Sequence, residues 1–272
     1  MSLLSPDTLS LYIEPSRIQA VKAVGFGQRA GEVRQRKADV HASDNWQGMV
    51  QTCTELIKQT KVQRVRVVLS DHLVRYACQP WRPELRNTEE ELGLAKLHFD
   101  DVYGTNASAD WHFALSGGRP GLARLSIAIP ASLFEVLQGN FGPELPKVQS
   151  VQTAFSATLR KHRKQFTPSG WLINLEQGRL TLGSWIDDSW QWVYSVHADL
   201  NTPDELLNRV RQEIRMSSIS LKPAQPLSIF IHAPAIEHLP FGTMEGVNFI
   251  PLKTLNQEAG AKYAFALLGA KA

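Results

Sequence analysis

The sequence predicts a mixed α/β fold built from two similar lobes, and three observations lead to this prediction. Short segments with alternating apolar residues, typical of strands, are interspersed with segments whose apolar residues recur every three to four positions, typical of helices. The order strand, strand, strand, helix, strand occurs near the N-terminus and recurs about 160 residues later, which indicates an internal duplication. The length of 272 residues also fits two domains, because a domain commonly has about 150 residues.

The first unit begins with three strands joined by short connections. Pro15 and Ser16 form the first turn. The third strand is polar, and we expect it at a sheet edge, where charges discourage pairing with other chains. The apolar residues over 46–57 have the spacing of an amphipathic helix, with Asp44 and Gln47 placed as its N-cap and N3 residues. Because parallel neighbours need a long connection, this helix fits a crossover to the next strand, and we expect a mixed sheet. The expected strands are 8–14, 17–24, 32–40 and 62–69.

The middle of the chain is expected to form a small inserted subdomain over about 73–129. Its helix starts at Thr88, with Glu91 in the position of a capping-box partner. The loop 116–121 contains three glycines and Arg119, but it lacks the Lys-Ser/Thr ending of a P-loop and lies between strands, so it is interpreted as a hairpin turn. The expected strands are 73–78, 110–115 and 123–129, and a further helix begins near Ala131.

The second unit repeats the scheme of the first. Three strands between 170 and 198 are separated by turns at 177–178 and 187–188, and a capping box at 202–205 opens the following helix. The aromatic residues of the third strand are expected on one sheet face, packed under a helix, with a binding platform as the alternative. These aromatic residues are Trp190, Trp192 and Tyr194, together with Trp185 of the strand before. The other expected elements are a strand at 148–151, a helix at 154–164, a strand at 226–232 and a last helix at 259–268.

Composition and charge exclude several classes of protein. The net charge is only +3, from 29 basic and 26 acidic residues, so it does not indicate a nucleic-acid partner. Cys53 and Cys78 lack the spacing of a metal or redox site. No apolar run reaches the roughly 18 residues of a membrane span, and the N-terminus lacks the pattern of a signal peptide, so we expect a cytoplasmic protein. The basic run Arg160–Lys164 is interpreted as a solvated helix end, with contact to anionic lipid or an acidic partner as the alternative.

Four segments resemble the actin-like ATPase fold, in which two ribonuclease-H-like lobes with mixed sheets flank a nucleotide cleft. Within that fold the chain looks most like the PilM type of type IV pilus assembly and the related cytoplasmic part of GspL. The resemblance places the N-terminal lobe at 1–146 and the C-terminal lobe at 147–272. The four segments are Leu9–Lys22, Asn140–Val151, Leu172–Gly178 and Ala261–Gly269.

The resemblance also implies where a nucleotide would lie, and the chain departs from the family pattern there. Glu14 stands in place of the first phosphate loop's Asp, and the following Pro15 has no N–H to offer. Asn174 stands where the second loop has a carboxylate. The glycine pair of the adenosine segment is missing from 231–235. The positions of this degenerate cleft that could still bind a ligand are Glu14, Ser16, Asn174, Gly178 and His232.

These departures predict a protein without catalytic residues, metal or nucleotide cofactor. The resemblance then implies a cytoplasmic scaffold in type IV pilus or type II secretion-like assembly. Such a scaffold would bind the cytoplasmic tail of a single-span inner-membrane protein and would contact an assembly ATPase. The alternatives are an active actin-like or sugar-kinase-type ATPase using ATP and Mg²⁺, and a ribonuclease-H-like nucleic-acid module. The second alternative needs several converging carboxylates, and only Glu14 has a suitable position.

Overall fold

The first lobe is a five-stranded mixed sheet with the strand order β3-β2-β1-β4-β8. β1 pairs antiparallel with β2 and parallel with β4, and β4 pairs parallel with β8. The computed structural model describes residues 7–24, 29–38, 40, 45–139, 141–217, 227–239, 241–244, 247–253 and 261–270. The strands of this sheet are β1 (Thr8–Glu14), β2 (Arg17–Val24), β3 (Arg29–Lys37), β4 (Arg64–Leu69) and β8 (Val148–Thr153).

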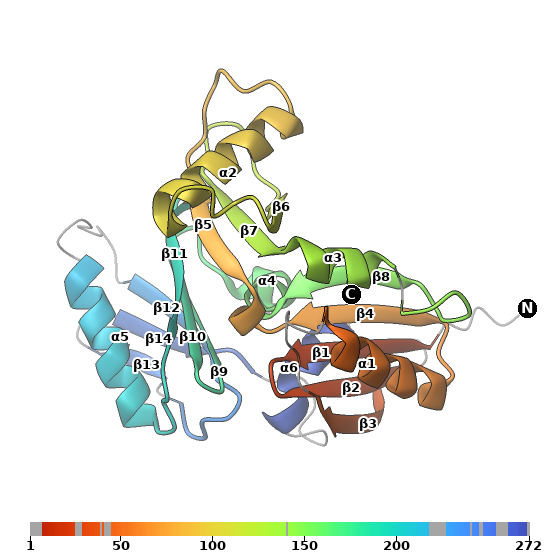
Figure 1. The fold of residues 1–272 in the computed structure, drawn as a ribbon. Coiled ribbons are helices and arrows are strands. Elements are labelled where there is room, and N and C mark those ends of the chain that lie inside the picture. Colours follow the sequence, from red (N-terminus) through yellow and green to blue (C-terminus); the bar gives the residue numbers. More distant parts are fainter. Residues whose placement is uncertain are drawn as a thin grey trace, which may run out of the picture.

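Helices cover both faces of the first sheet (Figure 1). α1 (Gln47–Thr60) packs its apolar stripe, which includes Met49 and Cys53, on one face. On the other face lie α4 (Ala154–His162) and α6 (Ala264–Ala270), whose Ala157 and Phe265 share a core cluster with Tyr12. The alternation along β1 therefore divides its residues between two apolar cores.

The second lobe repeats the strand order of the first, as β11-β10-β9-β12-β14, with β13 added at the edge. α5 (Pro203–Ser217) packs on one face of this sheet through Leu206 and Val210. The repeated order and strand directions confirm the predicted duplication. The strands are β9 (Gly170–Glu176), β10 (Arg179–Ile186), β11 (Ser189–His197), β12 (Leu227–His232), β13 (Gly242–Met244) and β14 (Val247–Pro251).

A third sheet, of order β5-β7-β6, projects from the junction of the two lobes (Figure 1). α2 (Thr88–Tyr103) packs on it through Phe99, and β5 lies beside β11 of the second lobe. Its strands are β5 (Arg75–Gln79), β6 (Trp111–Leu115) and β7 (Arg124–Pro130), and α3 (Ala131–Gln138) follows. This sheet lies within the segment expected to be a subdomain. β8, which the expected boundary at 146/147 assigns to the second lobe, pairs with β4 of the first sheet.

Two of the three predicted helix caps differ from the structure. α1 begins after Trp46, which has a left-handed backbone (φ 64°) and makes no capping bond, while the expected N-cap Asp44 lies outside the described residues. α2 is capped by Asn87, one residue before the expected Thr88, because the Asn87 side chain accepts a hydrogen bond from the Glu90 N–H at 2.9 Å. The capping box at the start of α5 is as expected: the Thr202 N–H donates to the Glu205 carboxylate, and the Glu205 N–H donates to the Thr202 hydroxyl oxygen.

The aromatic residues of β11 do not share one face, contrary to the prediction. The register with β10 shifts between Ser184, which faces Trp192, and Trp185, which faces Trp190. The extra residue in β11 is Gln191, and such a bulge reverses the alternation of side chains beyond it. Trp190 therefore packs in the core shared with the first lobe, while Trp192 packs towards α5.

Candidate functional site

Polar side chains of both lobes meet in the interior where β1, β4 and β9 end. The Tyr12 hydroxyl, on β1, donates to Glu176 Oε1, on β9. The other Glu176 oxygen accepts the backbone N–H of Asp71 at 2.8 Å. Since Tyr12 and Asp71 belong to the first lobe and Glu176 to the second, this carboxyl group links the lobes.

Asp71 is the second buried carboxyl group of the junction and lies in a single 3-10 turn directly after β4. Its Oδ1 accepts from the Tyr76 hydroxyl at 2.6 Å and from the Phe155 N–H at 3.2 Å, and its Oδ2 accepts from Asn174 Nδ2 at 3.1 Å. These donors come from β5, α4 and β9. Asp71 therefore holds three parts of the fold together.

Burial changes the protonation of both carboxyl groups. The pKa of Glu176 is raised well above its ordinary value, first by desolvation and then by the nearby charge of Asp71. The pKa of Asp71 is raised by desolvation too, but three hydrogen-bond donors favour its charged form. When two buried carboxyl groups are neighbours, one of them keeps its proton to a higher pH. Here that group is Glu176.

Asn174 and His232, both expected at the site, are in direct contact. Asn174 Nδ2 donates to Asp71, so its Oδ1 faces His232 Nδ1, which donates at 2.9 Å. The Thr158 hydroxyl lies 3.2 Å from the same oxygen. Burial, followed by the charge of His162, lowers the pKa of His232 to about 3, so its ring is neutral at physiological pH.

The other expected site residues lie in the two hairpin turns. Glu14 is buried at the end of β1 and forms an ion pair with Arg17 of the same hairpin. Ser16 is exposed in that turn, where its carbonyl accepts from the Ala38 N–H at 3.2 Å. Gly178 forms the β9–β10 turn with a φ of +72°, a left-handed conformation that favours glycine.

These residues do not match the donor set of a Mg²⁺–nucleotide site. Both polar atoms of the Asn174 amide are occupied by protein partners, and Glu14 is neutralised by Arg17. Pro15 offers no N–H to a phosphate. The described residues also contain no cluster of three or more His, Cys, Asp or Glu side chains that could hold a metal ion.

Sequence reasoning missed the central members of this network. Tyr12 and Tyr76 lie within strands and Asp71 comes just after one, and their partners lie up to 164 residues away in the chain. The one available signal was the polar pair Ser70-Asp71 directly after the apolar strand β4.

No helix in the described part of the chain is both long and apolar enough to cross a bilayer.

Comparisons with known proteins identify the fold. No family model matches the chain, and no curated protein matches its sequence. Among solved structures, the PilM–PilN type IV pilus biogenesis complex matches with a TM-score of 0.63 and 14% identity over 97% of both chains. The cytoplasmic domain of EpsL, an inner-membrane component of the Vibrio cholerae type II secretion system, matches with a TM-score of 0.57 and 12% identity, over 98% of this chain and 95% of that one.

A third match is a Bacteroides thetaiotaomicron protein of unknown function, described as having an actin-like ATPase fold. Its TM-score is 0.57 at 10% identity, over 97% of this chain and 95% of that one. These likenesses span both lobes and the third sheet, and they agree with the duplicated strand order. The chain therefore has the actin-like ATPase fold.

Proposed function

We propose that this chain is a non-catalytic scaffold in a type IV pilus or type II secretion-like assembly machine. It works in the cytoplasm and is held at the inner membrane by the cytoplasmic tail of a single-span partner. An assembly ATPase is its second partner. The proposal combines two kinds of support, the state of the nucleotide positions and the fold comparison.

The observation that carries the proposal is the closed network around Asn174. An actin-like ATPase needs free groups at this position for Mg²⁺ and phosphate, because phosphoryl transfer depends on positioning and electrostatics. Here Asn174 is fully buried and bonded to Asp71 and His232 instead. The same bonds that remove a nucleotide site add stability to the contact between the lobes.

The fold comparison supports the choice of partner. The structure with a TM-score of 0.63 is a PilM–PilN complex, and the EpsL domain belongs to an inner-membrane component. The first supports binding of a second assembly protein and the other supports a place at the inner membrane, and we propose that this chain meets its partner through a cytoplasmic tail. An extended tail could bind beside the lobe junction near Glu14, Ser16 and Gly178, where main-chain pairing and side-chain pockets give specificity.

Nucleotide binding tests the non-catalytic part of the proposal. Thermal unfolding is measured with and without millimolar Mg-ATP. A ligand at 100 times its dissociation constant adds roughly 2.7 kcal/mol of stability, which for a chain of this size raises the Tm by several degrees. We expect no shift. A clear rise in Tm would favour the active ATPase, and salt-dependent binding of oligonucleotides at low ionic strength would favour the nucleic-acid module.

A further inference from the structure

The outer edge of β3 is a surface that the lobe junction does not use. β3 ends the first sheet, so alternate backbone N–H and C=O groups of this strand point away from β2, and no strand of the described residues pairs with them. A cavity of about 540 Å³ is lined by residues Glu32–Lys37 together with Lys262 and Tyr263. Successive strand residues point to opposite faces. A cavity that touches six of them in a row therefore runs along the edge.

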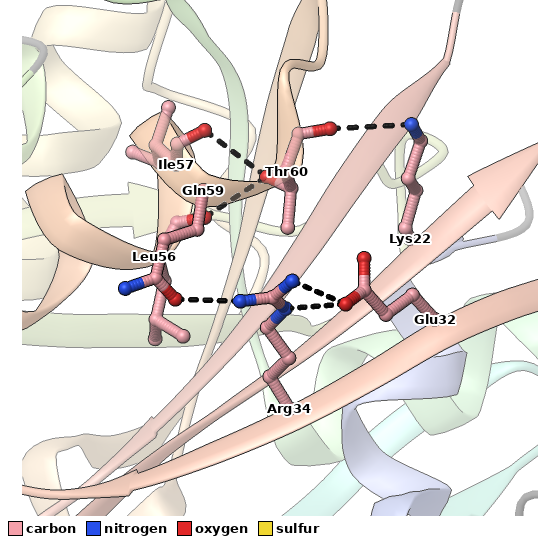
Figure 2. A network of polar contacts seen from close by, with 7 residues as sticks. All are labelled: Lys22, Glu32, Arg34, Leu56, Ile57, Gln59 and Thr60. Carbon is pink, nitrogen blue, oxygen red and sulfur yellow. Dashed lines mark hydrogen bonds and ion pairs between the residues drawn. The ribbon is translucent and has the colours of Figure 1, made fainter.

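The alternation of β3 assigns its side chains to the two faces of the sheet. Val33 packs with Tyr263 and α6, so Lys37, four residues on, lies on the same face. Arg34 lies on the α1 face, where it bonds to Glu32 and, at 2.6 Å, to Gln59 (Figure 2). Arg36 shares that face. The cavity thus has cationic side chains on both sides.

The edge of β3 carries more basic than acidic side chains among the described residues. Glu32 is neutralised by Arg34. Arg36, Lys37 and Lys262 are exposed, and no acidic side chain in the described part of the chain forms an ion pair with any of them. Lys262 Nζ instead lies 5.7 Å from the ring centre of Tyr263. Within the described residues, three cations without an ion-pair partner therefore lie beside a strand edge that no other strand pairs with.

We propose that β3 binds an extended acidic segment of a partner protein as an added strand. The segment's main chain pairs with the free N–H and C=O groups of β3, as in other cases of strand addition. Carboxylates at alternate positions of the segment lie on one face of the added strand, where they contact Lys37 and Lys262 on the α6 face. A second copy of this chain is a poor occupant, because pairing two β3 edges brings like charges together.

The test uses a fluorescein-labelled ten-residue peptide of alternating Glu and Thr, with binding to the full chain followed by fluorescence anisotropy. We expect binding that weakens with added NaCl. The K37E/K262E variant should bind at least tenfold more weakly. K96E/K147E is the matched control, because it makes the same charge change at two exposed lysines, on α2 and directly before β8, and it should bind as the wild type does. Equal affinities for K37E/K262E and K96E/K147E would overturn the proposal.

A second measurement separates strand addition from charge attraction alone. Two versions of the peptide are N-methylated, one at every Glu and one at every Thr. Only one of these sets of N–H groups can face β3, since successive N–H groups point to opposite edges of a strand. We expect one version to lose binding and the other to keep it. Equal binding of both versions, or tighter binding of a ten-nucleotide single-stranded DNA, would contradict the added strand.

This proposal stands apart from the proposed scaffold function. K37E/K262E leaves the lobe junction unchanged, so capture of a membrane partner's tail should persist in this variant. If the wild type captures the tail but does not bind the peptide, only the β3 site is refuted. If it binds the peptide but does not capture the tail, only the scaffold function is refuted.

Discussion

Glu176 is a buried carboxyl group that accepts hydrogen bonds from Tyr12 and from the Asp71 backbone, and its pKa is raised by desolvation. Its folded-state pKa lies above the ordinary value of 4.5, so the folded protein holds a proton that the unfolded chain releases. The stability from this group is complete below that value and is lost as pH rises towards the folded-state pKa.

The substitution E176Q tests this assignment. Gln keeps the shape and can still accept from Asp71, but it does not titrate. The wild type should therefore lose up to about 1.4 kcal/mol per pH unit, relative to E176Q, within the window above pH 4.5. Urea unfolding of both proteins between pH 5 and 9 gives the difference. A difference that stays constant over this range would show that Glu176 does not hold its proton.

Gly269 of α6 lies close against β1 and β4 of the first sheet. A Cβ at this position would lie 2.3 Å from Ser10 Oγ and 2.9 Å from Val68 Cγ2. G269A should therefore lower the free energy of unfolding by about 1–3 kcal/mol. G93A, in the middle of α2 where nothing lies within 4 Å of the added Cβ, should instead raise it by up to about 1 kcal/mol. Equal effects of the two substitutions on urea unfolding would be incompatible with this packing.

Individual site residues were predictable only where a family pattern indicated them. Asn174 and His232 were expected near each other, and they are hydrogen-bonded. Tyr12 and Glu176 were not expected as partners, because a contact between residues 164 positions apart depends on how the lobes pack. Local periodicity carries no information on such contacts.

α6 connects the two lobes through one aromatic side chain. The Phe265 ring stacks on Tyr12 of β1 with centroids 5.1 Å apart, and it meets His232 of β12 edge-on at 5.0 Å. F265A should cost about 3–5 kcal/mol, because it leaves a cavity between the lobes. F241A removes the same side chain from a position that is 82% exposed, and it should change stability by less than about 0.5 kcal/mol. Similar unfolding midpoints for the two variants would rule out a bridging role for Phe265.

Most strands and helices were predictable from the sequence, but two strands and the β-bulge in β11 were not. Long segments such as β1 and α1 were found because the apolar residues in their sequences recur with a regular period, of two in β1 and of three to four in α1. β13 and β14 were missed, and the three residues of β13 are too few to show a period. The bulge at Gln191 was missed because it depends on pairing with β10.

The whole molecule consists of two lobes of the same strand order, joined by a buried polar network. The repeated strand order follows from the duplicated pattern in the sequence, and it places the ends of β1 and β9 at one junction. In that junction, Asp71 is hydrogen-bonded to Glu176 and to Asn174. These bonds join the first lobe to the second.

Binding of a partner tail tests the central claim most directly. A synthetic peptide of the cytoplasmic tail of a single-span membrane protein encoded beside this chain is titrated into the full protein by calorimetry, with and without millimolar Mg-ATP. We predict that the tail binds and that its dissociation constant is the same within twofold under both conditions. Absence of tail binding, or binding that appears or disappears with Mg-ATP, would contradict a scaffold that works without nucleotide.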